Sequence, residues 1–122
     1  MYVLPGFAIT REFGGDEREA YLFGAERMRN PEKHDAIWKD AFLVTVSPVG
    51  AWGHSLFSDS PSNGPIGTAF VNDVIPALEE RFPISTDPAT RLLMGHGSGG
   101  WAAIWLQMNY PEVFGGAWAS SP

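Results

Sequence analysis

The feature that most constrains the fold is a glycine-rich turn between a short apolar run and a helix-forming run. Arg91 to Met94 predicts a strand, and the turn that follows reads Gly95-His96-Gly97-Ser98-Gly99-Gly100. From Gly99 to Asn109 apolar side chains recur at helical spacing, as Trp101, Ile104, Trp105 and Met108, until Tyr110-Pro111 ends the helix. A strand that turns directly into a helix is typical of a sheet covered by helices.

Strand patterns recur along the rest of the chain. Tyr2 to Leu4, Ala41 to Val46 and Gly116 to Ala119 predict further strands. The run from Ala41 to Val46 is continuously apolar, which suits a strand buried on both faces. Since strands and helices alternate, we predict βαβ units and therefore a parallel sheet with helices on both faces.

Two further helices are predicted between these strands, one over Asp16 to Arg29 and one from about residue 64 to Phe82. Pro76 lies inside the second helix and predicts a kink. Its apolar residues recur on one face, and we expect this stripe and that of residues 99–109 to pack in the core. Residues 47–63, rich in Gly, Ser and Pro, predict a loop.

Composition bounds the class of protein. The 122 residues suffice for one domain, and 44% hydrophobic residues indicate a globular core. A net charge of −6 argues against nucleic acid or an anionic membrane as a partner, and the absence of cysteine excludes thiolate catalysis and Cys-based zinc sites. We expect no cofactor, no transmembrane segment and no signal peptide, with the cytoplasm as the default compartment.

The glycine-rich turn fits two motifs. Gly95 to Gly100 matches G-x-G-x-x-G, in which bare amides at a helix N-terminus hold a pyrophosphate. That dinucleotide fingerprint also needs an acidic residue about 20 positions later, at the end of the next strand. The only acid after Gly100 is Glu112, which precedes that strand. Dinucleotide binding therefore stays open as the less favoured alternative.

The second motif is the nucleophile elbow, G-x-S-x-G, which holds a catalytic side chain on a strained strand-to-helix turn. Centring the motif on Gly97 puts Gly95 and Gly99 at the flanking sites but leaves the centre without a side chain. Centring it on Ser98 supplies a hydroxyl but puts His96 where a small residue is needed. The distance from the strand favours the first register, in which the backbone N–H of Ser98 is an oxyanion donor.

Residues 91–122, RLLMGHGSGGWAAIWLQMNYPEVFGGAWASSP, resemble the elbow region of the esterase D-like branch of the α/β-hydrolases. The stretches GHSLFSDSPSNGP and YVLPGF are similar to the same branch. This resemblance implies a reduced three-layer α/β-hydrolase fold, one partial domain over residues 1–122 that lacks family strands at both ends. It places the four strands in the order 41–46, 2–4, 91–94 and 116–119. It also implies carboxylic ester hydrolysis by acyl transfer, with the backbone amides of Phe7 and Ser98 forming the oxyanion hole.

The chain departs from this family at the catalytic positions. The nucleophilic serine of the family falls on Gly97, and no Asp or His follows Ser98, although the family order is Ser, then acid, then His. We therefore expect no triad chemistry on a small acyl ester. The alternatives are an esterase whose missing groups are supplied elsewhere, a non-catalytic binding or structural domain, and a displaced nucleophile at Ser98 with His54, His96 or another chain supplying its base.

Two further expectations concern the surroundings of the elbow. His54 is expected to form a local hydrogen bond in its loop, rather than to bind a metal ion with Asp59. A sheet of four strands leaves two open edges, which predicts a homo-oligomer.

Overall fold

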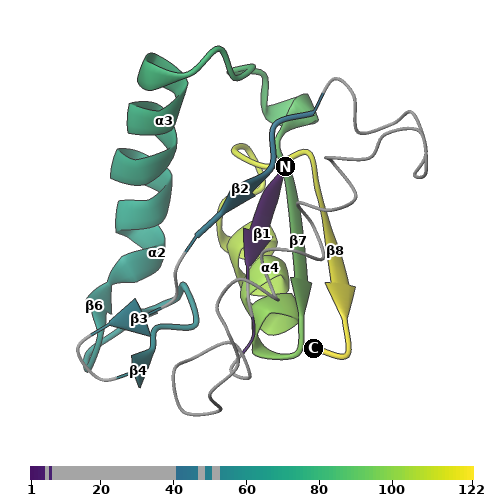
Figure 1. Ribbon diagram of the computed structural model, residues 1–122. Coiled ribbons are helices and arrows are strands. Elements are labelled where there is room, and N and C mark those ends of the chain that lie inside the picture. The colour runs from purple at the N-terminus through teal and green to yellow at the C-terminus, as the bar shows by residue number, and fades with distance from the viewer. Residues whose placement is uncertain (5, 7–40, 47–48, 51–52) are drawn as a thin grey trace.

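The computed structural model describes residues 1–4, 6, 41–46, 49–50 and 53–122. In this part of the chain four strands form one parallel sheet in the order β2-β1-β7-β8 (Figure 1). The strands are β1 (Tyr2–Leu4), β2 (Val44–Thr45), β7 (Leu92–His96) and β8 (Gly116–Ser120). The predicted α/β class and strand order are confirmed.

The strand predicted over Ala41 to Val46 is shorter and less buried than its sequence suggested. Only Val44–Thr45 pairs with β1, and the residues around it are half-buried, except for Phe42, which is exposed. Backbone bonds from Val44 N to Met1 O (2.9 Å) and from Val46 N to Val3 O (3.4 Å) continue the ladder. Since β2 lies at the end of the described sheet, it has a strand neighbour on one side alone.

The predicted loop over residues 47–63 contains short antiparallel pairs that the sequence did not reveal. β3 (Val49–Gly50) pairs with β4 (Gly53–His54), and β5 (Asp59–Ser60) pairs with β6 (Gly64–Pro65). Gly53 and Gly64 have φ angles of +100° and +80°, a region that favours glycine. The segment is therefore more ordered than its Gly/Ser/Pro composition indicates.

The helix predicted up to Phe82 forms in three consecutive pieces, α2 (Ile66–Ala69), the π-helical η4 (Phe70–Val74) and α3 (Ile75–Arg81). The π turn ends with a bond from Ile75 N to Phe70 O, directly before Pro76. Because proline lacks the N–H that continues an α-helix, the wider turn accommodates the residue for which we expected a kink. Phe82 is extended and ends the helix.

One face of the sheet carries the core. The register pairs Tyr2 with Leu93 and Leu4 with Gly95, so the side chains of Tyr2, Leu4 and Leu93 share a face. They belong to a buried cluster that also contains residues of the helices over 66–81 and 98–109. These include Phe70, Val71, Ile75, Ala102, Ala103 and Leu106. The stripe of the helix before β7 is thus mostly in the core, as predicted.

The described helices lie on the same face for a topological reason. The crossovers from β2 to β7 and from β7 to β8 step across the sheet in one direction, and right-handed crossovers of this kind leave their helices on one side. α2 and α4 (Ser98–Asn109) touch, since a Cβ on Gly67 would lie 2.6 Å from the Trp105 ring. The helix predicted over Asp16 to Arg29 lies outside the described residues.

The predicted core stripe of α4 is correct for Trp105, which packs against the core, and wrong for its other three residues. Trp101, Ile104 and Met108 are exposed, with 75% of Met108 accessible, and the buried face consists of Gly99, Gly100, Ala102, Ala103 and Leu106. At its first turn, α4 lies so close to the ends of β7 and β8 that only glycine fits between them, as the contacts described below show. The buried face of α4 is therefore determined by how closely its backbone approaches the strands, rather than by the periodicity of its hydrophobic residues.

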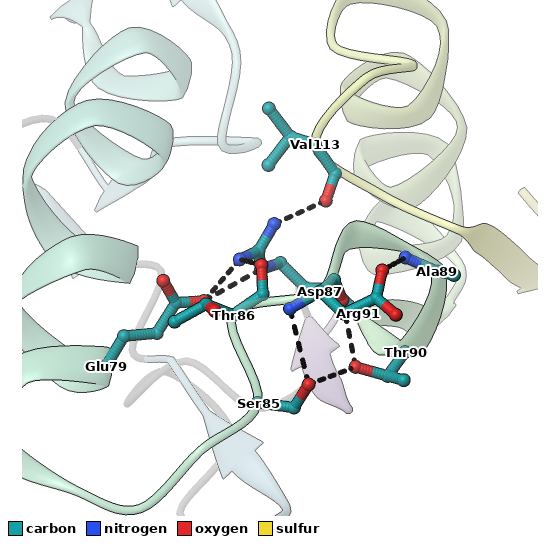
Figure 2. Close-up of polar contacts among 8 residues, drawn as sticks. All are labelled: Glu79, Ser85, Thr86, Asp87, Ala89, Thr90, Arg91 and Val113. Atoms are coloured by element: carbon teal, nitrogen blue, oxygen red, sulfur yellow. Dashed lines mark hydrogen bonds and ion pairs between the residues drawn. The ribbon is translucent and has the colours of Figure 1, made fainter.

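At its first end, β7 is fixed by a buried charge cluster centred on Arg91 (Figure 2). The guanidinium forms an ion pair with Glu79 of α3, to which both Nε and Nη2 donate. It also donates from Nη1 to Val113 O (2.6 Å) and from Nη2 to Thr86 O (3.2 Å). One side chain therefore ties α3, the loop before β7 and the segment before β8 together.

Candidate functional site

At its second end, β7 turns sharply into α4. The strand ends at His96, the helix begins at Ser98, and Gly97 between them has φ 57° and ψ −127°. Gly97 N donates to Ser120 O of β8 at 2.9 Å, and Gly97 O accepts from Trp101 N at 3.0 Å. The corner therefore lies where the Gly97-centred register places it.

The corner depends on the absence of a side chain at Gly95. A Cβ there would lie 2.1 Å from Gly99 O and 2.7 Å from Gly100 N, which are backbone atoms that cannot move aside. At Gly100 a Cβ would meet Ser120 O at 3.0 Å. These approaches explain the glycines of the turn as packing requirements of a strand that reverses into a helix.

Gly97 differs from its neighbours. A Cβ built on it meets nothing within 4 Å, so a side chain at this position would enter open space. Its positive φ is a conformation that other residues adopt only under strain. Strain combined with open space is what an elbow requires of the position that carries a nucleophile.

The turn after β1 lies directly against this corner. A Cβ on Gly6 would lie 2.8 Å from His96 O and 3.5 Å from Ser98 Oγ. The next residue is Phe7, whose amide the resemblance assigns to the oxyanion hole, and it lies outside the described residues. Gly6 shows that the chain reaches the corner immediately before that position.

A hydroxyl that the sequence analysis missed also lies at the corner. Ser120, the last residue of β8, pairs in register with His96, and its Oγ is 3.0 Å from His96 Nδ1. Both residues are exposed. The signal for this pair is the strand register, because the ends of adjacent parallel strands meet at one edge of a sheet.

His54 takes part in local structure, as predicted. It is buried, its Nδ1 accepts from Leu56 N at 3.0 Å, and its ring packs edge-on against Phe57. With Nδ1 occupied as an acceptor, the ring proton lies on Nε2.

Asp59 caps the next segment rather than facing His54 as a ligand. Its Oδ1 accepts from Thr68 N (2.9 Å), and its Oδ2 accepts from Thr68 Oγ1 (2.6 Å), which in turn contacts Tyr110 OH. The hydrogen bond from the Thr68 hydroxyl is the main reason that the pKa of Asp59 lies below its ordinary value. Within the described residues, no group of three or more His, Cys, Asp or Glu is placed to hold a metal ion.

A comparison with protein families covers this corner. The family model described as "Putative esterase" matches residues 48–122, more than half of the chain, from β3 to the end of β8. The chain belongs to this esterase family. The match contains the corner, α4 and Ser120, whereas β1 and β2 precede it. No curated protein matches the chain.

The residue at the centre of the elbow motif in this chain is Gly97. A triad needs a nucleophile, a base that takes its proton and an acid that orients the base. Gly97 supplies no nucleophile, and residues 99–122 contain neither Asp nor His.

No helix in the described part of the chain is long and apolar enough to cross a membrane.

Proposed function

We propose that the corner at Gly97 is the nucleophile position of an ester-binding site, and that the chain forms no acyl-enzyme there. The observation that carries this proposal is the combination of a positive φ with open space at Gly97, in a member of an esterase family. The substrate class is a small carboxylic ester, whose carbonyl would lie over the corner. Without a hydroxyl at position 97, the ester is bound and not cleaved by a triad.

The backbone amides of Ser98 and Phe7 are the proposed oxyanion donors. Ser98 follows the corner directly, and α4 begins without a side-chain cap, so the positive end of the helix dipole faces this position. Gly6, the residue before Phe7, supports the second assignment because it lies against His96 O and Ser98 Oγ. Amides placed in this way stabilise charge that develops on a carbonyl oxygen.

An introduced thiol tests the position. Because the chain contains no cysteine, Gly97→Cys carries the only thiol in the protein, and Ala77→Cys, at an exposed position of α3, serves as the matched control. Acylation by p-nitrophenyl acetate forms an oxyanion, whereas alkylation by iodoacetamide does not. The ratio of the two rates therefore reports oxyanion stabilisation independently of how readily each thiol ionises.

We expect this ratio to be at least about 10-fold higher in Gly97→Cys than in Ala77→Cys, since a single oxyanion donor contributes about 10²–10³ in rate to a complete enzyme. Equal ratios would contradict the proposal. Gly97→Ser should not gain turnover, because a serine hydroxyl needs a base that the triad order would place after it. Steady turnover by Gly97→Ser above that of the parent would mean that such a base is present.

We also propose that the chain associates with itself through its sheet edges. β2 and β8 end the described sheet, and each has one strand neighbour. Strands with open edges pair with other chains. Light scattering at tens of micromolar should show a dimer or larger species, and a monomer at that concentration would contradict this part of the proposal.

A further inference from the structure

The pair of His96 and Ser120 is the one described contact between an imidazole nitrogen and a serine hydroxyl that lies beside Gly97. His96 Nδ1 and Ser120 Oγ are 3.0 Å apart, within the range over which a base takes a proton from a nucleophile. Both side chains are exposed, so an ester can reach them. The carboxyl ends of parallel strands are also where open α/β sheets bind their ligands.

We infer that Ser120 is a secondary nucleophile of this chain, activated by His96, and that it accepts acyl groups from small activated esters. The inference deepens the proposed function and rests on it, because the ester is the one held at the corner. It differs from the displaced-nucleophile hypothesis for Ser98, since the reacting hydroxyl belongs to β8 and not to α4.

The backbone, rather than surface side-chain rotamers, brings the two groups together. β7 and β8 pair over five consecutive positions, from Leu92 with Gly116 to His96 with Ser120. Side chains at paired positions of a parallel ladder point to the same face. The bond from Gly97 N to Ser120 O (2.9 Å) then fixes Ser120 beside the corner. A weakly held surface contact would lack these three constraints.

The chemistry balances without any further group. In the tautomer with its proton on Nε2, His96 accepts at Nδ1 from the Ser120 hydroxyl. Ser120 Oγ attacks the carbonyl carbon of the ester while its proton passes to Nδ1. The tetrahedral intermediate then breaks its bond to the alcohol oxygen, which takes the proton from Nδ1 and leaves an acyl ester on Ser120. Water hydrolyses this ester by the same route, with His96 again as the base.

The geometry also limits the substrate. The described structure provides no acid partner that orients His96, so the leaving group must depart without strong assistance. The pair therefore suits esters with acidic leaving alcohols, such as p-nitrophenyl acetate, and phosphonate probes that carry fluoride. The first turn of α4, which begins beside Gly97, supplies a positive field for the developing oxyanion.

A fluorophosphonate probe followed by peptide mass spectrometry tests the assignment on the whole chain. We expect the label on Ser120, with a labelling rate that falls at least about 10-fold in Ser120→Ala and in His96→Gln. Ser121→Ala, the exposed neighbouring serine, is the matched control and should label like the parent.

Several outcomes would overturn the inference: no label, a label on Ser98, or an unchanged rate in His96→Gln. If Ser120→Ala unfolds, Ser120→Cys keeps a nucleophile of similar size, and acylation of its thiol should still depend on His96. The Gly97→Cys experiment separates the two proposals. A high ratio in Gly97→Cys without a label on Ser120 removes the inference alone, whereas equal ratios in Gly97→Cys and Ala77→Cys remove the ester site itself.

Discussion

The two ends of β7 are built in opposite ways. At its start Arg91 is buried and forms an ion pair, and its remaining donors bind backbone oxygens of two other segments (Figure 2). At its end the strand turns at Gly97, where a side chain would meet nothing within 4 Å. The start of β7 is held in place by the side chain of Arg91, whereas the turn at its end depends on residues without a side chain.

This difference teaches where function is to be sought. At the charged end, the ion pair and hydrogen bonds of Arg91 join α3, the loop before β7 and the segment before β8. The glycine end has the positive φ of Gly97, the open space beside it and the exposed His96–Ser120 pair. In this molecule, the buried polar interactions of Arg91 stabilise the fold at the start of β7, whereas the candidate site lies at its end, where Gly97 has no side chain.

The largest effect is expected at the charged end. Arg91→Met removes the partner of a mostly buried Glu79, and breaking a buried ion pair on one side costs about 3–5 kcal/mol. Urea unfolding followed by far-UV circular dichroism measures the change. Arg91→Met combined with Glu79→Leu should recover most of the loss, because neither charge then remains buried alone.

The comparison would fail at this point if Arg91→Met cost less than about 1 kcal/mol, the range of an exposed salt bridge. The charged end would then contribute no more to the free energy of unfolding than the glycine end does. Arg81→Met is the matched control, since Arg81 lies exposed on the same helix as Glu79.

The next effect concerns the glycine end. Gly95→Ala forces a Cβ to 2.1 Å from Gly99 O, and overpacking of this kind costs about 1–3 kcal/mol or more. Gly97→Ala has open space around the new methyl group and pays only for its positive φ, a strain of about 1–3 kcal/mol. We therefore expect Gly95→Ala to unfold at a lower urea concentration than Gly97→Ala. The reverse order would show that the corner is looser than its geometry indicates.

Most element types could be predicted from the sequence, because the apolar runs are short, separate and bounded by Gly and Pro, whereas the strand order came from the resemblance to the α/β-hydrolases. The buried face of α4 could not. Its period indicated Trp101, Ile104 and Met108, whereas close approach of α4 to the strand ends selected Gly99 and Gly100. Nothing local in the sequence states how near a helix lies to a strand.

The candidate site shows the same division. Gly97 could be placed at the corner from its distance to the preceding strand, because elbow spacing is local. Ser120 could not be found in this way, because its proximity to His96 depends on the pairing of β8 with β7. The ion pair of Arg91 with Glu79 is similarly non-local, since it joins residues that no motif relates.

A smaller effect is expected at Asp59, a carboxylate that lies outside the core. Hydrogen bonds from Thr68 lower its pKa from the ordinary value of 3.8. A lowered folded-state pKa adds stability above pH 3.8 that is lost as the pH falls through the folded value. Asp59→Asn should remove this part of the acid sensitivity in urea unfolding between about pH 5 and pH 2. Asp73→Asn, an exposed acid on η4, is the control, and equal changes in both variants would contradict the role of Thr68.

The smallest effect tests whether every buried polar group near the charged end of β7 has a hydrogen-bond partner. Tyr2 OH is buried, and among the described residues no hydrogen bond of good geometry reaches it, although Arg91 lies close enough to lower its pKa by a side-chain interaction and Glu79 raises it. An unpartnered buried hydroxyl is costly, so Tyr2→Phe should leave stability unchanged or raise it by less than about 1 kcal/mol at pH 7. Tyr110→Phe, which loses the contact with Thr68 Oγ1, should instead lower it by about 1 kcal/mol.

The same pair of variants separates further at high pH. Burial raises the pKa of Tyr2, so the unfolded chain ionises this phenol first, at about its ordinary value of 10.0, and the native protein loses stability as the pH rises above that value. Tyr2→Phe removes the group and should keep more of its stability than the parent at about pH 10.5. If Tyr2→Phe is instead destabilised at both pH values, the hydroxyl has a partner after all, and the charged end of β7 extends to β1.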